Sequence, residues 1–375
     1  MTFGKEKIIA VVGPTASGKT RIAAALASDF NGEVISADSM QIYKGLNVGT
    51  AKPRAEETLD IKHHLIDFVE PSQSYSAALY QRDARAAVER LFANGQVPVI
   101  AGGTGLFINA VLYDMSFSKT GKNDGLRADL ERRYAEIGGE AMLAELSAID
   151  GESAKKLHAN DKKRVVRYFE SALSGEKPDA DEFNLKLFYK NHLIIGLNPE
   201  RSKLYEKINE RTDAMIENGL IDEVRDLIKG GLTFDAQSMQ SIGYKEFKDF
   251  FDSYGNIGVT ARIIRPSAKY GKFQDLADGG AGKSSAVTQG MPSSDYGKFI
   301  AFCDGVKDGK SDADYAGNID DIRVVTELIK RHTRNYAKRQ ITWFKRYKHA
   351  VWFDSYDENA YAAIKSLAAA FLAAD

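Results

Sequence analysis

The octet GPTASGKT occupies residues 13–20, between an apolar run at 8–12 and an alanine-rich segment with a helical pattern. This is the full spacing of a P-loop, in which glycines let backbone N–H groups converge on phosphate oxygens and the next helix presents its positive end. In such a loop Lys19 reaches the terminal phosphates and the Thr20 hydroxyl binds Mg²⁺. The octet therefore predicts a strand, a phosphate-binding loop and a helix, and leaves open whether the phosphates belong to a nucleotide.

Length and charge bound the classes to which the chain can belong. Its 375 residues exceed what one hydrophobic core usually supports, so two domains, or one domain with insertions, are expected. The 51 basic residues are balanced by 52 acidic ones, so any site for a polyanion must be a local patch. The single cysteine, Cys303, excludes a disulfide framework and a multi-cysteine zinc site, and it fits a reducing compartment such as the cytoplasm.

Neither end of the sequence predicts contact with a membrane. The first residues run almost at once into the strand before the P-loop, which leaves no room for a signal or transit peptide. The apolar stretch at 360–374 is interrupted by Lys365 and is shorter than the roughly 20 residues of a membrane span. We therefore expect a cytoplasmic protein without a membrane partner.

The pattern along the chain predicts an α/β fold, with a P-loop NTPase-like parallel sheet flanked by helices. Residues 1–114 alternate short apolar runs with helical patterns and form the first part of this core. Residues 115–190 change to charged helices, which we interpret as an inserted helical domain. The core continues over 191–253 and is completed by 318–375, while Gly, Ser, Tyr and Lys dominate the atypical insertion at 254–317.

Individual elements follow from the same patterns. Short apolar runs predict strands at 8–12, 33–36, 97–101, 192–197 and 350–353. Ser76 is expected to cap a helix that ends near Gly95. Further helices are expected at 126–138, 141–149, 161–173, 199–229 as one or two helices, 240–250, 320–346 and 360–374.

Asp38 follows the second predicted strand and so lies at the same edge of the sheet as the P-loop, where open α/β sheets bind ligands. A carboxylate at this place can hold Mg²⁺ through water or accept a proton from an attacking nucleophile. A helix cap made together with Ser39 is the alternative. The glycine cluster at 102–105 faces the same edge with Thr104, although such loops are more often turns than ligand sites.

The adjacent pair His63 and His64, with Asp67, invites comparison with a metal site. Adjacent side chains do not easily meet on one ion without a third partner. A turn with solvated or hydrogen-bonded histidines is the better explanation.

Two basic stretches stand out against the neutral whole. The first contains Lys162, Lys163, Arg164 and Arg167. The second, at 330–349, has eight Lys and Arg residues interleaved with aromatic ones and no acidic residue. Helical spacing places Arg331, Arg334 and Lys338 on one face, which suits a nucleic-acid backbone. An ordinary charged helix exposed to solvent is the alternative.

Eight segments in order resemble the tRNA dimethylallyltransferase family, also called tRNA isopentenyltransferases. They are GPTASGKT, ADSMQIYKGLNVGTAKP, HHLID, AGGTGLFINA, RVVRYFE, LYEKINERTDAMIENGLIDEV, QSIGYKEF and AKRQITWFKR, and they span about residues 7–250 and 319–355. The resemblance implies transfer of a dimethylallyl group from dimethylallyl diphosphate to N6 of the adenosine 3′ to the anticodon. The implied acceptors are tRNAs that read codons beginning with U, and diphosphate is the second product.

The resemblance also implies roles for particular residues. Asp38 takes the proton from N6, while Lys19 and Arg211 stabilise the charge that grows on the leaving diphosphate. The catalytic set implied is Asp38, Thr20 and Arg211, with Thr20 on Mg²⁺ and the diphosphate held by Gly13, Pro14, Thr15, Ala16, Ser17, Gly18, Lys19 and Thr20. Contacts with the tRNA anticodon arm are implied for Asp38, Ser39, Met40, Gln41, Thr104, Arg127, Lys163, Arg164, Val165, Val166 and Arg167. The chain is expected to act as a monomer.

Three other functions remain as alternatives. An isopentenyltransferase that acts on free adenine nucleotides would share the P-loop, Asp38 and Arg211 but would not need the helical insertion or the basic helix. A P-loop kinase or NTPase normally has an acidic partner strand and a lid of arginines, and neither pattern is visible. A non-catalytic RNA-binding protein is disfavoured by the intact Lys19, Thr20, Asp38 and Arg211.

The stretch at 254–317 departs from the pattern of the family, which usually passes through a short turn at this point. Within it, GGAGKSS at 279–285 imitates a phosphate loop but lacks the first glycine spacing and a preceding strand. We interpret the whole stretch as a surface excursion or small accessory module.

Overall fold

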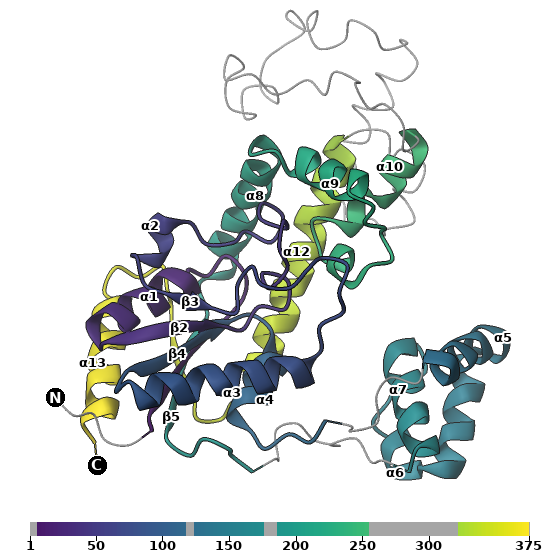
Figure 1. The fold of residues 1–375 in the computed structure, drawn as a ribbon, viewed down its shortest axis with the longest axis horizontal. Coiled ribbons are helices and arrows are strands. Elements are labelled where there is room, and N and C mark those ends of the chain that lie inside the picture. Colours follow the sequence, from purple (N-terminus) through teal and green to yellow (C-terminus); the bar gives the residue numbers. More distant parts are fainter. Residues whose placement is uncertain (1–5, 118–123, 176–185, 255–321, 375) are drawn as a thin grey trace, which may run out of the picture.

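A six-stranded, all-parallel sheet forms the centre of the protein (Figure 1). The computed structural model describes residues 6–117, 124–175, 186–254 and 322–374. The strands lie in the order β3-β2-β4-β1-β5-β6. Their bounds are Ile8–Val12 (β1), Gly32–Ser36 (β2), His63–His64 (β3), Val97–Gly102 (β4), His192–Leu197 (β5) and Val351–Phe353 (β6). The expected α/β fold is confirmed.

Five of the six strands agree with the sequence patterns to within one residue at each end. At the sixth, β3, a turn with solvated or hydrogen-bonded histidines was expected. The turn is wrong, but both rings do make hydrogen bonds, His63 with the Ile61 carbonyl and His64 with the Glu33 carboxylate. His63 and His64 pair with Val34 and Ile35 at the edge of the sheet. Two polar residues at an edge produce no apolar run, so the pattern of the sequence cannot reveal such a strand.

The strands of the core are apolar throughout because helices cover both faces of the sheet. Side chains of β1 alternate between two hydrophobic clusters: Ile8 and Val12 lie in one, and Ile9 and Val11 in the other. Helices α3 (Ala77–Ala93) and α4 (Gly105–Leu112) contribute to the first cluster. Helices α1 (Lys19–Asp29) and α13 (Ala360–Ala373) contribute to the second.

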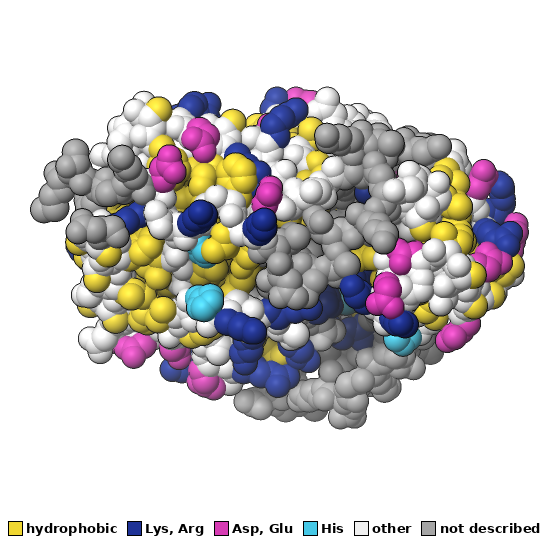
Figure 2. All heavy atoms as spheres, turned by 90° about the horizontal axis from the view of Figure 1, so that it is seen from below, with side chains coloured by type: hydrophobic (Ala, Val, Ile, Leu, Met, Phe, Trp, Pro, Cys, Tyr) yellow, Lys and Arg dark blue, Asp and Glu magenta, His cyan; other side chains and the backbone are white. Residues whose placement is uncertain are grey.

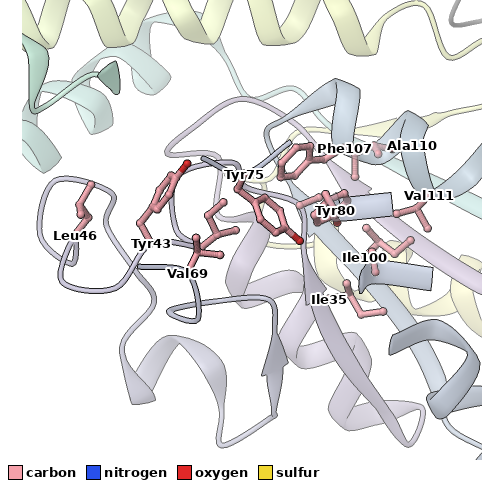
Figure 3. Packing of buried hydrophobic residues seen from close by; sticks show 14 of the residues in the cluster. Ile35, Tyr43, Leu46, Val69, Tyr75, Tyr80, Ile100, Phe107, Ala110 and Val111 are labelled. Carbon is pink, nitrogen blue, oxygen red and sulfur yellow. The ribbon is translucent and has the colours of Figure 1, made fainter. Parts of the chain in front are cut away.

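Aromatic packing joins helix α3 to helix α4. Tyr80 is fully buried and stacks on Phe107 of α4, with ring centroids 3.9 Å apart. Figure 3 shows the two rings among the aliphatic side chains Ile35, Ile100 and Val111. Because the interior is packed this tightly, the ends of β2 and β4 are held in fixed positions.

The remaining helices follow the expected pattern in most places. They are α2 (Ala55–Thr58), α5 (Asp124–Ile149), α6 (Gly151–Ala154), α7 (Lys162–Leu173), α8 (Arg201–Glu217), α9 (Leu220–Lys229), α10 (Lys248–Tyr254) and α12 (Ile322–Phe344). The cap predicted for α3 is present, since Leu79 N–H donates to Ser76 Oγ at 3.2 Å. Asn94 follows the last residue of α3, as expected.

The expectation of a single helix at 240–250 is wrong. Two 3₁₀ turns, Gln237–Gln240 and Lys245–Phe247, precede α10. Gly243 lies between these turns with φ +99°, a left-handed backbone that glycine adopts easily and that a helix does not contain.

Helices α5, α6 and α7 pack around a hydrophobic cluster of their own. Met142, Leu146 and Val165 are fully buried in it, and among the described residues this cluster shares no member with the two clusters at the sheet. Helix α5 is interrupted at Gly138, with φ +81°, which agrees with the two shorter helices expected there. Figure 1 shows these helices as a group beside the core. The domain boundaries assigned above remain a prediction.

The insertion lies almost entirely outside the described residues, and the described helices can be compared with the length of a membrane span. The insertion expected at 254–317, with GGAGKSS and Cys303, lies beyond the described part of the chain except for Tyr254. Among the helices that the structure describes, none is both long and apolar enough to cross a membrane.

Packing of α13 on the sheet can be tested by truncating a buried side chain. Ile364 is fully buried, so Ile364→Ala is expected to lower the free energy of unfolding by about 2–5 kcal/mol through lost burial and the cavity that remains. Ser366 lies exposed on the same helix, and Ser366→Ala is expected to change stability by less than about 0.5 kcal/mol. Urea unfolding of both variants makes the comparison. Equal losses would mean that α13 is not docked on the sheet.

Candidate active site

The phosphate loop at 13–20 joins β1 to α1 at the carboxyl edge of the sheet. Gly18, with φ +76°, precedes the helix in a left-handed conformation, and a Cβ on Gly13 would lie 2.7 Å from the carbonyl oxygen of Leu197. The buried Ser17 hydroxyl donates to the Pro14 carbonyl at 2.8 Å and stiffens the loop. The first N–H groups of α1 have no partner within the helix, so its N-terminus is suited to bind an anion.

Lys19 is the cation closest to this loop. Its Nζ donates to the Pro14 carbonyl oxygen at 2.6 Å. Burial lowers the pKa of Lys19 to about 7, the negative charge of Asp38 raises it in part, and the positive charge of Arg211 lowers it further. The ammonium group is therefore poorly solvated and would be stabilised by a bound anion.

Asp38 lies just beyond the end of β2 and lines the central cavity. Its Oδ1 accepts hydrogen bonds from the backbone N–H groups of Met40 at 2.9 Å and Gln41 at 3.3 Å. The carboxylate thus caps a turn rather than a helix, which corrects the alternative suggested by the sequence. No hydrogen bond from the described residues reaches Oδ2. One oxygen fixes the orientation of the side chain, and the other is available to accept a proton.

Thr104 joins the glycine loop after β4 to the loop after β2. Its Oγ1 accepts from the backbone N–H of Ser39 at 3.1 Å and donates to Ser39 Oγ at 3.2 Å. Ser39, Met40 and Thr104 do not line the cavity, whereas Gln41 does. In this structure the hydroxyl groups of Ser39 and Thr104 hold two loops together beside Asp38.

Arg211 projects from α8 into the same cavity. Its Nη2 donates to the carbonyl oxygen of Ala51 at 3.4 Å. Burial lowers the pKa of Arg211, and the negative charges of Glu57 and Asp38 oppose this effect. Lys19, Arg211 and Asp38 are far apart in the sequence, and the fold brings all three to one cavity.

The loop at 47–52 depends on a carboxylate that sequence reasoning missed. Glu223 of α9 accepts backbone N–H groups of Asn47 at 2.8 Å, Val48 at 2.8 Å and Gly49 at 3.1 Å, and also the Tyr244 hydroxyl at 2.5 Å. A Cβ on Gly49 would lie 2.5 Å from the Tyr244 ring, so only glycine permits this approach. The motifs around Gly49, Glu223 and Tyr244 were visible, but nothing in the sequence shows that they meet.

These elements enclose a cavity of about 970 Å³. Its wall combines phosphate-loop residues 15–20 with Asp38, Gln41, Arg211 and two residues of α12, Tyr336 and Gln340. The volume falls at the upper end of the range for small-molecule sites. Cations, the carboxylate of Asp38 and a helix N-terminus converge there, which suits a phosphorylated ligand and a proton transfer.

The residues of the helical insertion for which tRNA contacts are implied differ in their burial and in their partners. Lys163 and Arg164 are exposed at the start of α7. Arg127 and Arg167 both pair with the buried carboxylate of Glu170, at 2.6 and 3.1 Å. Val165 and Val166 are buried in the hydrophobic cluster of this unit. Their side chains form part of its core, and the tRNA contact implied for this stretch stays a prediction.

The sequence predicted that Arg331, Arg334 and Lys338 share one basic face of α12, but in the structure some basic residues of this helix pair with α8. Arg334 donates from Nη1 to Asn209 Oδ1 of α8 at 2.7 Å, and Lys330 pairs with Asp213 at 2.7 Å. The exposed basic residues of this region are Lys338, Arg339, Lys345, Arg346 and Lys348. Lys338, Arg339 and Arg346 line a second hollow of about 420 Å³ with Thr342 and Trp343. Figure 2 shows Lys and Arg side chains gathered on one face of the molecule.

A parallel sheet with a phosphate loop after its first strand, and with lysine, arginine and carboxylate groups around one cavity, defines a P-loop-like α/β protein with a cavity suited to a phosphorylated ligand. A family model described as IPP transferase matches residues 41–276 and 273–347. The chain therefore belongs to the IPP transferase family of tRNA dimethylallyltransferases and is a prenyl transferase, as the eight motifs predicted.

Relatives of nearly the same length support this assignment. A tRNA dimethylallyltransferase of Geobacillus thermodenitrificans is 38% identical over 360 residues, which cover 95% of this chain and 93% of that protein. The protein of the same name from Clostridioides difficile is 36% identical over 351 residues and covers 93% of this chain, with 92% of its own length.

Solved structures agree with the fold. The full-length tRNA isopentenylpyrophosphate transferase of Bacillus halodurans is 33% identical with a TM-score of 0.60, over 98% of this chain and 97% of that one. A eukaryotic dimethylallyltransferase acting on tRNA has a TM-score of 0.65 at 22% identity, over 97% of this chain and 78% of that one, and this likeness shows the fold alone.

The lowered pKa of Lys19 predicts that diphosphate binding depends on pH. Because its pKa is about 7 without a ligand, and a bound anion favours the charged form, binding above that pH must add a proton. We expect the affinity for inorganic diphosphate to fall as pH rises through about 7. The arginine of Lys19→Arg remains charged between about pH 6 and about pH 9, so the affinity of this variant for diphosphate is expected to depend less on pH than that of the unmodified protein.

Isothermal titration calorimetry in buffers with different ionisation enthalpies measures the proton uptake on binding. The arginine variant is the control for titration of the diphosphate itself, which both proteins share. Equal proton uptake by the two proteins would contradict the assignment to Lys19.

Proposed function

We propose that this chain transfers a dimethylallyl group from dimethylallyl diphosphate to N6 of the adenosine 3′ to the anticodon, in tRNAs that read codons beginning with U. The products are N6-(dimethylallyl)adenosine and diphosphate. The observation that carries the proposal is the single cavity in which Lys19 and Arg211 face the carboxylate of Asp38. The names of the relatives, tRNA dimethylallyltransferase and tRNA isopentenylpyrophosphate transferase, supply the substrate class.

The phosphate loop and its cations hold the donor. Backbone N–H groups at the start of α1 bind the diphosphate, which restores full charge on the desolvated Lys19. Negative charge grows on the diphosphate as the bond between the allylic carbon and oxygen breaks. Lys19 and Arg211 are fixed before this happens, so they stabilise the leaving group without reorganisation.

A divalent cation fits the same end of the cavity, and we propose Mg²⁺. The described residues contain no group of three or more His, Cys, Asp or Glu side chains that could hold a metal on their own. Mg²⁺ usually takes one or two protein ligands together with substrate phosphates and water, so the Thr20 hydroxyl beside the diphosphate is a suitable donor. When bound, the ion neutralises charge on the diphosphate.

Asp38 acts on the acceptor. The exocyclic amine of adenine is a weak nucleophile because its lone pair is delocalised into the ring. As N6 forms a bond to the allylic carbon, the amine proton passes to Oδ2 of Asp38, the oxygen without a partner among the described residues. The fixed turn around Oδ1 keeps the carboxylate aimed into the cavity during this transfer.

The tRNA anticodon arm reaches the cavity with its target base turned out of the stack. Such a rearrangement costs a few kcal/mol, and less in a loop than in a duplex. The exposed Lys163 and Arg164 of the helical insertion are suited to phosphate contacts. The described residues of one chain bring Lys19, Asp38 and Arg211 to one cavity, which supports our proposal of a monomer. The single cysteine supports the cytoplasm as its compartment.

A prenyl transferase that acts on free adenine nucleotides is the second candidate, because the cavity alone does not distinguish the acceptors. The helical insertion and the exposed basic residues of 338–348 favour tRNA, since a free nucleotide needs neither.

The acceptor can be established by incubating the protein with Mg²⁺, radiolabelled dimethylallyl diphosphate and one of three acceptors. These are unmodified tRNA that reads codons beginning with U, free AMP, or none. We expect label in tRNA alone. Label in AMP would move the chain to the nucleotide-prenylating class, and absence of transfer to both would contradict the proposed reaction.

The role of Asp38 is tested with Asp38→Asn, which keeps an acceptor for the two N–H groups of the turn but cannot take a proton at neutral pH. We expect kcat to fall by about 10²–10⁴-fold, while the affinities for dimethylallyl diphosphate and tRNA change by less than about threefold. Asp235→Asn, on an exposed residue outside the cavity, is the control. Unchanged turnover of Asp38→Asn would remove it as the base.

A further inference from the structure

One side chain of α12 connects the two halves of the cavity. Gln340 is 5% exposed, and its amide makes two hydrogen bonds to backbone groups. Thr15 N–H donates to Oε1 at 2.8 Å, and Nε2 donates to the Gly103 carbonyl at 2.8 Å. Thr15 belongs to the phosphate loop and Gly103 to the loop after β4. A single amide group therefore joins the loop that holds the donor to a loop on the acceptor side.

The contact continues to the candidate base. Thr104, next to Gly103, holds the backbone and hydroxyl of Ser39, and Ser39 follows Asp38. The Tyr336 hydroxyl lies 3.5 Å from the same Gly103 carbonyl, one turn before Gln340. These hydrogen bonds form one continuous path from the phosphate loop to the turn that carries Asp38.

The surrounding backbone is shaped for this glutamine. A Cβ on Gly103 would lie 2.2 Å from Gln340 Nε2, so the two can meet only because residue 103 has no side chain. Two backbone groups need hydrogen-bond partners here: the N–H of Thr15 needs an acceptor, and the C=O of Gly103 needs a donor. A glutamine amide has a donor and an acceptor at one end, whereas a carboxylate or an apolar side chain of similar size lacks one or both.

We propose that Gln340 is a positioning residue that sets the spacing between the diphosphate of the donor and the carboxylate of Asp38. This inference rests on the proposed function, because it concerns the alignment of donor and acceptor. The bond that Thr15 N–H makes to Gln340 leaves the later amides of the loop for the diphosphate. A shift of about 1 Å between reacting groups can cost about 100-fold in rate, so the effect is on turnover more than on binding.

Gln340→Met tests the proposal, because it keeps the length and apolar packing of the side chain but loses both hydrogen bonds. We expect kcat to fall by about 10–100-fold, with KM for dimethylallyl diphosphate and Kd for tRNA within about threefold. Gln340→Glu keeps the acceptor for Thr15 N–H, so its kcat is expected to fall less than that of Gln340→Met. Gln73→Met, on an exposed residue, is the control. A purely structural role would lower Tm and leave kcat per folded molecule unchanged, and that result would overturn the proposal.

A second measurement does not depend on the reaction. Hydrogen exchange followed by NMR reports the N–H groups of Thr15 and Ser39, and both are expected to exchange faster in Gln340→Met if Gln340 couples the loops. Unchanged exchange at Ser39 would overturn the coupling even if the unmodified protein transferred nothing to tRNA. Absence of transfer by the unmodified protein would instead contradict the proposed function.

A double variant tests whether the Gly103 contact is the one that matters. Gly103→Ala places a methyl group 2.2 Å from Nε2, too close for the present contact, so its effect and that of Gln340→Met should act through the same contact. We expect the loss of kcat in the double variant to equal that of the more severe single variant. Losses that multiply would show independent effects and overturn the assignment to this contact.

Discussion

Parallel pairing of β1 with β4, and of β4 with β2, is the constraint on which the site depends. Because all strands run in one direction, the segments that follow these three strands leave the sheet at the same edge. These segments carry the phosphate loop, the glycine loop and Asp38, so the three lie close together. The apolar strands are buried on both faces, so the register is strongly specified and the three segments have little freedom to shift.

Electrostatics then gives this edge its chemistry. Lys19 and Arg211 are both desolvated, and burial lowers the pKa of each. Burying cations is costly unless opposite charge is near, and Asp38 supplies it only in part. A bound diphosphate would provide the missing negative charge. In the proposed reaction this cost is offset when the donor binds and again when charge develops on the leaving group, which is the pattern expected of a site that favours the transition state.

The C-terminal part of the chain completes a site that the N-terminal part begins. Besides Gln340 on α12, the Tyr356 hydroxyl donates to the carbonyl oxygen of Ala16 in the phosphate loop at 2.7 Å. Arg334 of α12 holds Asn209 on α8, the helix that presents Arg211. Helix α12 thus supports both the phosphate loop and the helix that presents Arg211. The basic residues of α12 therefore include Lys330 and Arg334, which pair with residues of α8, and Lys338 and Arg339, which are exposed.

The sequence by itself determined the local features: the strands, the phosphate loop with Lys19 and Thr20, the cap at Ser76, the helical insertion and the family. These depend on apolar periodicity, glycine spacing and ordered motifs, which are properties of neighbouring residues. It did not determine the edge strand β3, the break at Gly243, the burial of Val165 and Val166, or the contacts of Glu223 and Gln340. Most of these depend on which segments meet in the fold, and hydrogen bonds such as those of Glu223 to the loop at 47–49 and of Gln340 to Thr15 join residues more than a hundred positions apart and leave no periodic signal. Only the tertiary structure decided them, because packing and the pairing of buried polar groups choose those partners.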